Sequence, residues 1–391
     1  MHLGRPLAGP ETLHIDVTNG CNTNCVTCWD HSPLLHSARP LVWKRQQIDA
    51  GAVADLLNDV AELGGLRAVI LSGMGEPFTH PDIYSMIAEV KRRGLHLTII
   101  TNLVAADEQR ILELGVDQLL IGLHGASEAA YRAFHPSFVR DEWSCVRRML
   151  AAFRAAGRGF KHVHVICRTN AHELVDMVRL GHESAAEQVN FKLASLRDGT
   201  ERIGLTPEQR RALLDPGGES GVAAAITEAE RLGVATNLDV FGAQLGAGGD
   251  DTAPIEDVGC FMGYAYSRVL VDGTVLFCCN AEVRVGSLDT HSFAELWDGP
   301  EWNALRARMR RGDYFDSCRQ CGKFNQNVQL SRRFEQVYGT ERLLTVTGRA
   351  RRSDAGTAGS WRSAASRCSR ACCAGSSGCT ASPRPHTATI T

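Results

Sequence analysis

Short β-branched or apolar runs alternate with longer amphipathic segments from residue 13 to about residue 195. In the longer segments the apolar residues recur every three to four positions, which predicts helices that bury one side. Because a strand that returns through a helix pairs parallel to the strand before it, this alternation predicts βα units in series. The chain is therefore expected to belong to the α/β class, with a parallel sheet and helices outside it.

The core is expected to contain six strands. They are predicted at residues 13–19, 67–73, 96–102, 118–125, 162–168 and 189–195. A chain of 391 residues has room for such a core and a smaller domain. We expect an N-terminal extension over residues 1–12 and the core over residues 13–204.

A stretch rich in Gly and Ala separates this core from a smaller C-terminal region. Residues 205–255 begin with one predicted helix and then read as a linker. Residues 256–344 contain several cysteines, a predicted hairpin that turns at Asp272–Gly273 and a predicted helix over 292–312. Residues 345–391 have too few large apolar side chains to offset their ordering entropy, so a disordered tail is predicted.

The charge pattern excludes several classes of partner. The chain has 42 basic and 44 acidic residues, well mixed, so it lacks the basic stripe of a nucleic-acid-binding protein. It contains no apolar run long enough to span a membrane and no signal peptide, so a cytoplasmic protein is expected. In such a chain, 14 cysteines are expected to bind a metal or a cluster rather than to form disulfides.

Three cysteines follow the first predicted strand, at Cys21, Cys25 and Cys28. A loop at the carboxyl end of a parallel strand carries the active site in βα folds. Soft thiolates suit zinc or an iron–sulfur cluster, and a [4Fe–4S] cluster usually takes four cysteines, so three would leave one iron open. A zinc site closed by His31 is the alternative.

A second motif, GMGEP, ends the second predicted strand on the same face. Gly73 and Gly75 would let the backbone approach a ligand closely, Glu76 offers a carboxylate, and Pro77 fixes the turn into the next helix. Glycines at a strand end alone indicate only a tight turn. Their position on the same face as the thiols indicates a binding site.

The C-x3-C-x2-C and GMGEP motifs together resemble the two signatures of the radical S-adenosylmethionine (SAM) superfamily. The resemblance implies a partial (β/α)6 barrel and a [4Fe–4S] cluster whose open iron binds the amino and carboxylate groups of SAM. The GMGEP turn would bind that amino group. Reductive cleavage of SAM would yield a 5′-deoxyadenosyl radical that abstracts hydrogen from a substrate, with flavodoxin or ferredoxin as an external electron donor.

Other positions of the family pattern match less closely. The family commonly has an aromatic residue just before the third cysteine, but here Thr27 stands there and Trp29 follows the cysteine. Asn102 and Asn170, after the third and fifth predicted strands, resemble positions that contact the ribose or carboxylate of SAM. Asparagine at a strand end is also a common helix cap.

A second group of cysteines resembles the SPASM/Twitch extension of radical SAM enzymes. In that resemblance Cys260, Cys278, Cys318 and Cys321 hold one auxiliary [4Fe–4S] cluster, and Cys279 is a neighbour or a substitute ligand. Such a cluster would transfer electrons, which favours a substrate oxidation over a methylation, or it would only stabilise the fold. A zinc ribbon is the alternative metal site.

The remaining cysteines carry less information. Cys145 and Cys167 stand alone in apolar surroundings and are expected to pack in the core. The tail contains four more, at Cys368, Cys372, Cys373 and Cys379, for which a metal site is the weaker hypothesis.

Three polar residues at strand ends are catalytic candidates. His124 could hold a hydroxyl group or accept a proton, and Arg168 or Lys192 could bind an anionic group. A structural or solvent-facing role is the alternative for each of them. Tyr264 and Tyr266 are weaker candidates.

The substrate is the least determined part of the prediction. Only 20 residues precede Cys21, too few for the leader-peptide recognition domain of many peptide-modifying relatives, so a small polar metabolite such as a sugar, aminocyclitol or nucleoside is expected. A maturase that modifies a ribosomally made peptide or a protein side chain is one alternative. A non-catalytic iron–sulfur or zinc protein is the other.

Overall fold

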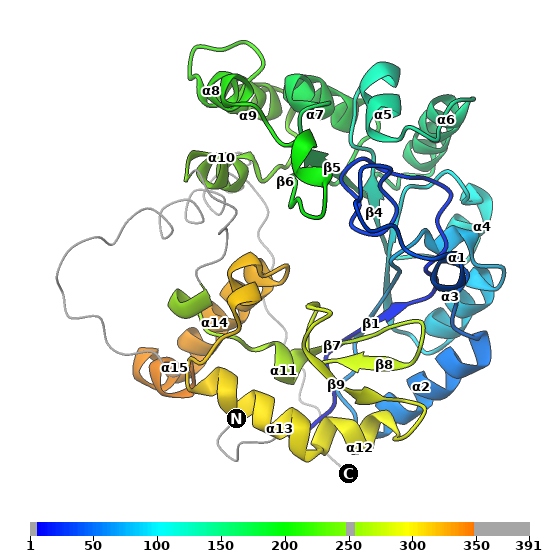
Figure 1. Ribbon diagram of the computed structural model, residues 1–391, viewed down its shortest axis with the longest axis vertical. Coiled ribbons are helices and arrows are strands. Elements are labelled where there is room, and N and C mark those ends of the chain that lie inside the picture. Colours follow the sequence, from blue (N-terminus) through cyan, green and yellow to red (C-terminus); the bar gives the residue numbers. More distant parts are fainter. Residues whose placement is uncertain (1–5, 248–254, 348–391) are drawn as a thin grey trace, which may run out of the picture. The chain divides into compact units, whose positions relative to one another are not determined.

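The computed structural model describes residues 6–247 and 255–347. Its sheet has nine strands in the order β6-β5-β4-β3-β2-β1-β7-β8-β9 (Figure 1). The six strands of the core pair in parallel. They are β1 (Thr12–Asp16), β2 (Ala68–Ser72), β3 (His96–Thr101), β4 (Gln118–Gly122), β5 (Lys161–Ile166) and β6 (Gln188–Leu193). The predicted parallel sheet is confirmed.

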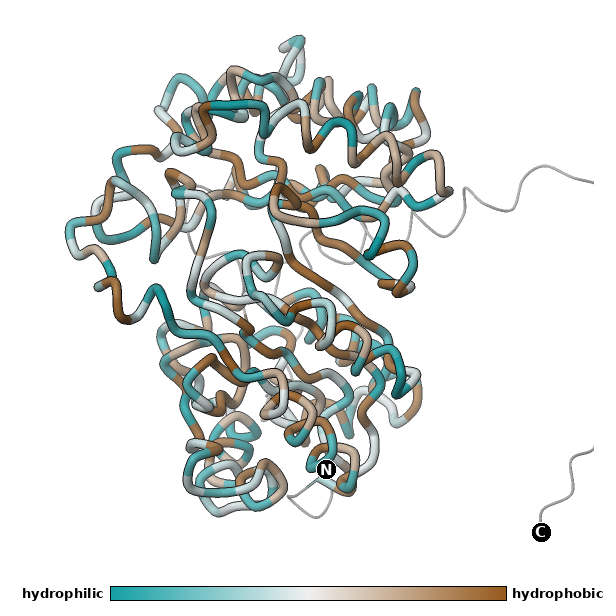
Figure 2. Tube along the Cα trace, turned by 90° about the vertical axis from the view of Figure 1, so that its right-hand side faces the viewer, coloured by the Kyte–Doolittle hydropathy of each residue, from teal (hydrophilic) through white to brown (hydrophobic). Residues whose placement is uncertain are grey.

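Helices cover one face of this sheet, which we call the outer face. They follow one another around it in Figure 1, and hydrophobic residues alternate with hydrophilic ones along them (Figure 2). They are α2 (Ala50–Glu62), α3 (Ile83–Arg92), α4 (Glu108–Glu113), α5 (Glu128–Phe134), α6 (Glu142–Ala155) and α7 (Leu174–Glu183). Strands β6 and β9 remain at the two edges, so the barrel is not closed.

The other face of the sheet, the inner face, is more polar. Side chains alternate along each strand, so that Val69 and Leu71 of β2 are buried under the helices whereas Ile70 is only half-buried on the opposite side. Strand register places further members of the inner face beside Ile70, among them His14, Asp16, Thr98, Ile100, Leu120, Val163, Val165, Asn190, Lys192, Tyr266 and Arg268. An open barrel with such a lining can admit a substrate.

The segment expected to be a linker is helical over its described part. It contains α8 (Pro207–Leu214), α9 (Val222–Leu232) and α10 (Leu238–Gly246). Ala225 and Phe241 pack with Phe191 of β6 in a hydrophobic cluster of their own. The Gly and Ala content suggested a flexible connection, but small residues here allow helices to pack closely against the edge of the sheet. Residues 248–254 lie outside the described ranges.

The C-terminal region continues the same sheet. Strand β7 (Tyr266–Val269) pairs parallel with β1, and β8 (Thr274–Leu276) and β9 (Arg284–Ser287) follow in antiparallel order. The expected hairpin turn is confirmed, with Gly273 at φ 74°. Sequence reasoning treated this region as separate because no local pattern reveals which strand pairs with the free edge of β1.

Several short helices complete the C-terminal region. The single helix expected over 292–312 is two, because Gly299 ends α12 and Pro300 begins α13. The helices are α11 (Met262–Ala265), α12 (Phe293–Asp298), α13 (Pro300–Arg310), α14 (Phe324–Tyr338) and α15 (Thr340–Thr347). The predicted tail and its four cysteines lie outside the described residues from position 348 onward.

Turns and single-turn helices lie between these elements. They are α1 (Leu41–Lys44) and the 3-10 helices η1 (Pro77–Thr79), η2 (Ala171–Glu173), η3 (Thr200–Ile203), η4 (Ile255–Asp257) and η5 (Asp316–Gln320). Among the described helices, none has the length and apolar character needed to cross a membrane.

An aromatic cluster holds α12 and α13 against the hairpin. Trp302 is fully buried, its ring lies 4.5 Å from that of Trp297 and 5.8 Å from that of Phe293, and its indole N–H donates to the Gly263 carbonyl at 3.2 Å. Phe277, which directly precedes the cysteine pair, lies 6.0 Å from Trp302. This packing positions the second group of cysteines.

We expect Trp302→Ala to lower the free energy of unfolding by about 3–5 kcal/mol, because it leaves a cavity among these rings. Chemical denaturation followed by circular dichroism measures the change. The exposed Val337→Ala is the control and should stay within about 0.5 kcal/mol of the wild type. A similar small change for Trp302→Ala would contradict the role of this cluster.

Candidate functional site

The first cysteine loop and the GMGEP turn lie side by side at the carboxyl ends of β1 and β2. Beyond the strands the pairing continues, since the Gly75 N–H donates to the Thr18 carbonyl at 3.1 Å and the Glu76 N–H donates to the Gly20 carbonyl at 2.8 Å. Cys21 follows Gly20 directly. The turn therefore fixes the backbone at the point where the cysteine loop begins.

This contact explains the two glycines of the turn. A Cβ atom on Gly73 would lie 2.1 Å from the Thr18 carbonyl oxygen, and one on Gly75 would lie 1.9 Å from the Gly20 carbonyl oxygen. Both distances are far below van der Waals contact. We expected the glycines to let the backbone approach a ligand; in the structure, what they approach is the backbone before Cys21.

The three thiols of the first loop interact with one another. Burial raises the pKa of Cys21 to about 12 and raises the pKa values of Cys25 and Cys28, and the charges of neighbouring thiols raise those of Cys21 and Cys25 further. The backbone N–H groups of Asp30 and His31 donate to the Cys28 sulfur at 3.5 Å and 3.4 Å. Because burial and the charges of their neighbours disfavour the thiolate form, a bound cation, such as the irons of an iron–sulfur cluster, would be needed to stabilise it.

The zinc alternatives require a different arrangement. A closed zinc site needs at least three ligands around one point, and in residues 6–247 and 255–347 no group of three or more His, Cys, Asp or Glu side chains could hold a single metal ion. His31 instead lies beside Trp43, with ring centroids 6.0 Å apart. The thiols of this loop are soft donors of the kind that an iron–sulfur cluster takes.

Glu76 accepts three hydrogen bonds in a buried position. The donors are the Phe78 N–H at 3.2 Å, the Thr101 hydroxyl at 2.6 Å and the Asn102 N–H at 2.7 Å. Burial nevertheless raises the pKa of Glu76 to about 7, against the effect of these donors. A positively charged group beside this carboxylate would offset that burial.

The two asparagines differ in what their side chains contact. The amide of Asn102 donates to the side-chain oxygen of Asn22 at 2.7 Å, within the first cysteine loop. The amide of Asn170 donates to the His124 and Val165 carbonyls, both at 2.8 Å, and accepts from the Cys167 N–H at 2.9 Å. Asn102 thus reaches the loop, whereas the hydrogen bonds of Asn170 are all made to backbone.

Trp29 is held at the end of β6. Its indole N–H donates to the Ser195 carbonyl at 2.7 Å, and the Arg197 guanidinium lies 3.9 Å from its ring centroid. Whether this ring replaces the aromatic contact that Thr27 cannot make stays a prediction. Cys167 is fully buried and Cys145 half-buried against the core, as expected for packing residues.

The second group of cysteines converges in the C-terminal region. The pKa of Cys260 is raised to about 12 by burial and by the charges of Cys321, Cys318 and Cys279. Cys278 and Cys279 form a hydrogen bond with each other. A Cβ atom on Gly322 would lie 3.3 Å from the Cys279 sulfur, so this thiol lies against the loop that contains Cys318 and Cys321. Either member of the pair is placed to complete a set of four.

A buried polar network joins the core to the C-terminal region through the paired strands β1 and β7. Arg268 binds both oxygens of Asp16, at 2.9 Å and 2.8 Å. His14 lies between the Tyr266 hydroxyl, at 2.6 Å, and the Ser72 hydroxyl. Burial raises the pKa of Asp16 although Arg268 opposes this. Sequence reasoning missed this network; the alternation of His14 and Asp16 with apolar residues in β1 was the available signal.

The three catalytic candidates have different surroundings. His124 has φ 56°, accepts a hydrogen bond from the Val165 N–H at 3.0 Å and stacks on Phe134. Arg168 is exposed and donates to the Gly204 carbonyl at 3.2 Å. Lys192 belongs to the inner face of β6. Of the three, Lys192 is the one whose side chain is free to meet a substrate there.

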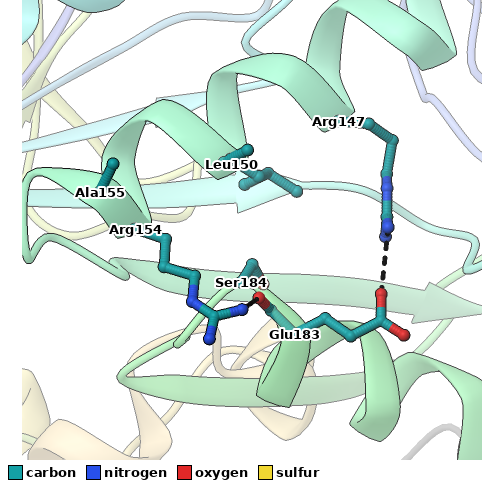
Figure 3. A pocket seen from close by; sticks show the side chains of 7 residues that line it. Arg147, Leu150, Arg154, Ala155, Glu183 and Ser184 are labelled. Carbon is teal, nitrogen blue, oxygen red and sulfur yellow. Dashed lines mark hydrogen bonds and ion pairs between the residues drawn. The ribbon is translucent and has the colours of Figure 1, made fainter.

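A separate hollow of about 310 Å³ lies on the outer side, between α6 and α7 (Figure 3). Arg147, Leu150, Arg154 and Glu183 line it, and Arg147 and Glu183 form an ion pair at 3.0 Å. None of the predicted site residues belongs to its lining. It is a groove between packed helices and not part of the cysteine sites.

We expect Gly75→Ala to displace the start of the cysteine loop and prevent the first cluster from assembling. After anaerobic reconstitution, iron analysis should find about four fewer irons per chain than in the wild type. Gly246→Ala is the matched control, because a Cβ atom there would meet no atom closer than 4.0 Å. Full iron content in Gly75→Ala would contradict the proposed role of this contact.

Comparison with known families assigns both regions. Residues 15–181 match the radical SAM superfamily, and residues 260–322 match the SPASM iron–sulfur cluster-binding domain. Two curated relatives cover most of the chain. The PqqA peptide cyclase of Xanthomonas campestris pv. campestris is 26% identical over 324 residues, 80% of either chain. The AdoMet-dependent heme synthase of Methanosarcina barkeri is 23% identical and covers 75% of this chain and 83% of its own.

Solved structures share the fold. SuiB of Streptococcus suis bound to its precursor peptide SuiA superposes with a TM-score of 0.56 at 16% identity, over 78% of this chain and 69% of SuiB. The radical SAM match implies a [4Fe–4S] cluster and SAM, and the SPASM match implies auxiliary iron–sulfur binding. The chain belongs to the radical SAM superfamily of enzymes and carries a C-terminal SPASM domain.

Proposed function

We propose that this enzyme is a maturase that oxidatively modifies a ribosomally made peptide or a protein side chain. The observation that carries the proposal is the continuous sheet, in which β1 leads to one cysteine set and its neighbour β7 leads to the other. A substrate on the inner face would lie within reach of both. PqqA peptide cyclase, which is named for a peptide substrate, is similar to this chain over 80% of its length, a span that includes both regions in part.

In this proposal Cys21, Cys25 and Cys28 hold the first [4Fe–4S] cluster and leave one iron to SAM. When loaded, the site supplies a 5′-deoxyadenosyl radical that removes a hydrogen atom from the substrate. The chain's own contribution is to orient SAM and exclude water. In this proposal the residues that orient SAM around the cysteine loop are Gly73, Gly75, Glu76, Pro77 and Asn102. Asn170, which was expected to join them, is fully buried and its side chain bonds to backbone groups.

Glu76 would bind the amino group of SAM through its charge. Its carboxylate is held by three donors, but burial raises its pKa to about 7, so a nearby ammonium group would favour the ionised form. Pro77 begins the 3-10 helix η1 and its buried ring fixes the turn.

The second set would hold one auxiliary [4Fe–4S] cluster. Cys260, Cys318 and Cys321 supply three ligands, and Cys278 the fourth, with Cys279 as the substitute. A cluster with four protein ligands would have no open iron for SAM, and it would supply an acceptor for the electron that the substrate radical loses as it becomes the oxidised product. This role matches an oxidation rather than a methylation.

The relatives favour a peptide over the small polar metabolite that the sequence suggested. PqqA peptide cyclase is named for a peptide, and SuiB was solved with its precursor peptide. The heme synthase relative keeps a small-molecule substrate as the second candidate. We also propose that the enzyme works in the reducing cytoplasm with a flavodoxin or ferredoxin as electron donor, because its thiols and clusters need a reducing compartment.

We propose boundaries at residues 13–204 for the radical SAM core and 256–344 for the SPASM domain. Residues 205–247 pack on the core through α8, α9 and α10 and are best grouped with it.

With SAM, a reductant and a panel of synthetic peptides that contain cysteine or aromatic residues, the wild type should release 5′-deoxyadenosine. The control is Cys28→Ala, which removes one of the three ligands, and liquid chromatography with mass spectrometry measures the product. Hydrogen loss should occur in a peptide and not in sugars or aminocyclitols tested in parallel. No 5′-deoxyadenosine above the control would exclude the radical reaction, and modification of a sugar alone would exclude the peptide substrate.

Removal of two auxiliary ligands should separate SAM cleavage from product formation. We expect Cys318→Ala/Cys321→Ala to lower iron from about eight to about four per chain. It should still form 5′-deoxyadenosine but give no oxidised peptide, because the electron has no acceptor. Cys145→Ala, outside both sets, should leave iron and product unchanged. Normal yields of oxidised peptide in the double variant would show that the second set is only structural.

A further inference from the structure

The segment that follows the first cysteine loop carries an unbalanced positive charge. Residues 31–48 contain Arg39, Lys44 and Arg45 and no acidic residue. Arg39 donates to Asp30 at 2.7 Å, so its charge is neutralised. Among the described residues, no carboxylate forms an ion pair with Lys44, which is half-buried, or with Arg45, which is exposed. Two cations are therefore open to a negatively charged partner.

Two apolar side chains stand beside these cations in the sequence. Leu41 and Val42, in the single-turn helix α1, are 69% and 75% exposed. Single exposed apolar side chains are common on protein surfaces, but two adjacent ones, followed closely by two open cations, have the apolar and charged parts of a protein-binding surface. We call Leu41, Val42, Lys44 and Arg45 the α1 patch.

Hydrogen bonds hold this segment against the start of the first cysteine loop. The Asn19 N–H donates to the Gln46 carbonyl at 2.9 Å, and the Asn19 amide donates to the Gln46 side-chain oxygen at 3.1 Å. A Cβ atom on Gly20 would lie 3.3 Å from the Lys44 carbonyl oxygen, and Cys21 comes next in the chain. The segment that carries the patch therefore lies against the backbone that leads into the cysteine loop.

A second set of contacts ties α1 to the other end of the same loop. Besides its ion pair with Asp30, Arg39 has its guanidinium 5.0 Å from the ring centroid of Trp43, which belongs to α1. Asp30 follows Cys28 by two positions, and its N–H donates to the Cys28 sulfur at 3.5 Å. Because α1 is held at both ends of the cysteine loop, its exposed side chains have a fixed position beside that loop.

This position suits a protein that delivers electrons. In the proposed function the first cluster takes one electron from an external protein, and the segment lies against the loop that would hold that cluster. The segment belongs to none of the strands that form the inner face, so the patch is separate from the surface proposed for the substrate. Electron-transfer encounters are weak, bury little surface and depend on charge, which a small basic patch with apolar neighbours provides.

Charge decides between the other occupants of the patch. A second copy of the chain, bound through a two-fold interface, would bring Lys44 and Arg45 against the same cations of its partner. A nucleic acid requires a more extensive basic surface. Flavodoxins and ferredoxins, which the proposed function invokes, are acidic proteins and complement the patch.

We propose that the α1 patch binds an acidic one-electron donor protein. The donor loses one electron, the first cluster gains it, and no bond forms or breaks at the patch. This inference rests on the proposed function for the use of the electron, whereas binding of the donor does not depend on it. The four side chains of the patch position the donor and take no part in the radical reaction.

The test measures binding of the donor to the full-length reconstituted enzyme. The probes are an oxidised flavodoxin and an oxidised ferredoxin, both acidic, and cytochrome c, a basic electron-transfer protein. Each is titrated by calorimetry at low and at high salt. The test variants are Lys44→Glu/Arg45→Glu and Leu41→Ser/Val42→Ser.

Two double variants of α14 are the matched controls, since this helix also carries an adjacent pair of exposed arginines and an adjacent pair of exposed apolar residues. They are Arg332→Glu/Arg333→Glu and Val337→Ser/Tyr338→Ser. The second readout is 5′-deoxyadenosine formed from SAM, driven in one arm by reduced flavodoxin and in the other by dithionite. Dithionite is a small reductant that needs no docking surface, so it shows whether the first cluster is intact.

The wild type should bind flavodoxin or ferredoxin, and the affinity should fall as salt rises, because salt screens exposed charges. At low salt, Lys44→Glu/Arg45→Glu should weaken this binding roughly tenfold or more, whereas Leu41→Ser/Val42→Ser should weaken it at both salt concentrations. The α14 controls should bind like the wild type, and cytochrome c should not bind. The test variants should form less 5′-deoxyadenosine with flavodoxin and as much as the wild type with dithionite.

Equal affinity of the wild type and both test variants for the acidic donors would overturn the proposal. So would a wild type that binds neither donor, or an equal loss in the α14 controls. A dimer of the wild type that dissociates in Leu41→Ser/Val42→Ser, seen by analytical ultracentrifugation, would assign the patch to a second copy instead. If the donors bind through the patch but neither reductant yields 5′-deoxyadenosine, the docking surface stands and the proposed function fails.

Discussion

The parallel pairing of β7 with β1 is the interaction on which the rest of the structure depends. It places the SPASM hairpin on the free edge of the core sheet and carries the Asp16–Arg268 ion pair and the His14–Tyr266 hydrogen bond on the inner face. Since β1 leads into the first cysteine loop and β7 into the hairpin that ends at the second set, one strand pair determines how both sets face the substrate. Hydrogen bonds from the Phe293 N–H to Asp59 and from the Trp297 indole to the Ala8 carbonyl add to this junction.

The second constraint is the contact between the GMGEP turn and the backbone before Cys21. Glycines there allow two strand ends to approach more closely than any side chain permits, and the resulting hydrogen bonds fix the start of a loop that has little regular structure of its own. Backbone hydrogen bonds therefore hold the GMGEP turn and the first cysteine loop together. Gly73 and Gly75, which the sequence suggested would let the backbone approach a ligand, act first by positioning the backbone before Cys21.

Prediction from the sequence worked where a signal is local and failed where a contact is distant. The six core strands were found within one to three residues of their observed ends, because strand and helix periodicities differ over a short window. The helix α8 was expected, but α9 and α10 were mistaken for a linker, because their Gly and Ala content masks a weak periodicity that only packing on β6 stabilises. Periodicity could place the catalytic candidates His124, Arg168 and Lys192 at strand ends. It could not show that the side chains of His124 and Arg168 would form hydrogen bonds with backbone groups.

The sequence by itself determined the chemistry: the spacing of Cys21, Cys25 and Cys28, the GMGEP turn and the later cysteines identify the radical SAM and SPASM regions, because ligand type and spacing are local properties. The tertiary structure alone decided that both regions share one sheet and that Arg268 neutralises Asp16 on its inner face. These features depend on the pairing of strands about 250 positions apart. The interactions that favour this pairing form only between distant segments, so no short stretch of sequence reveals them.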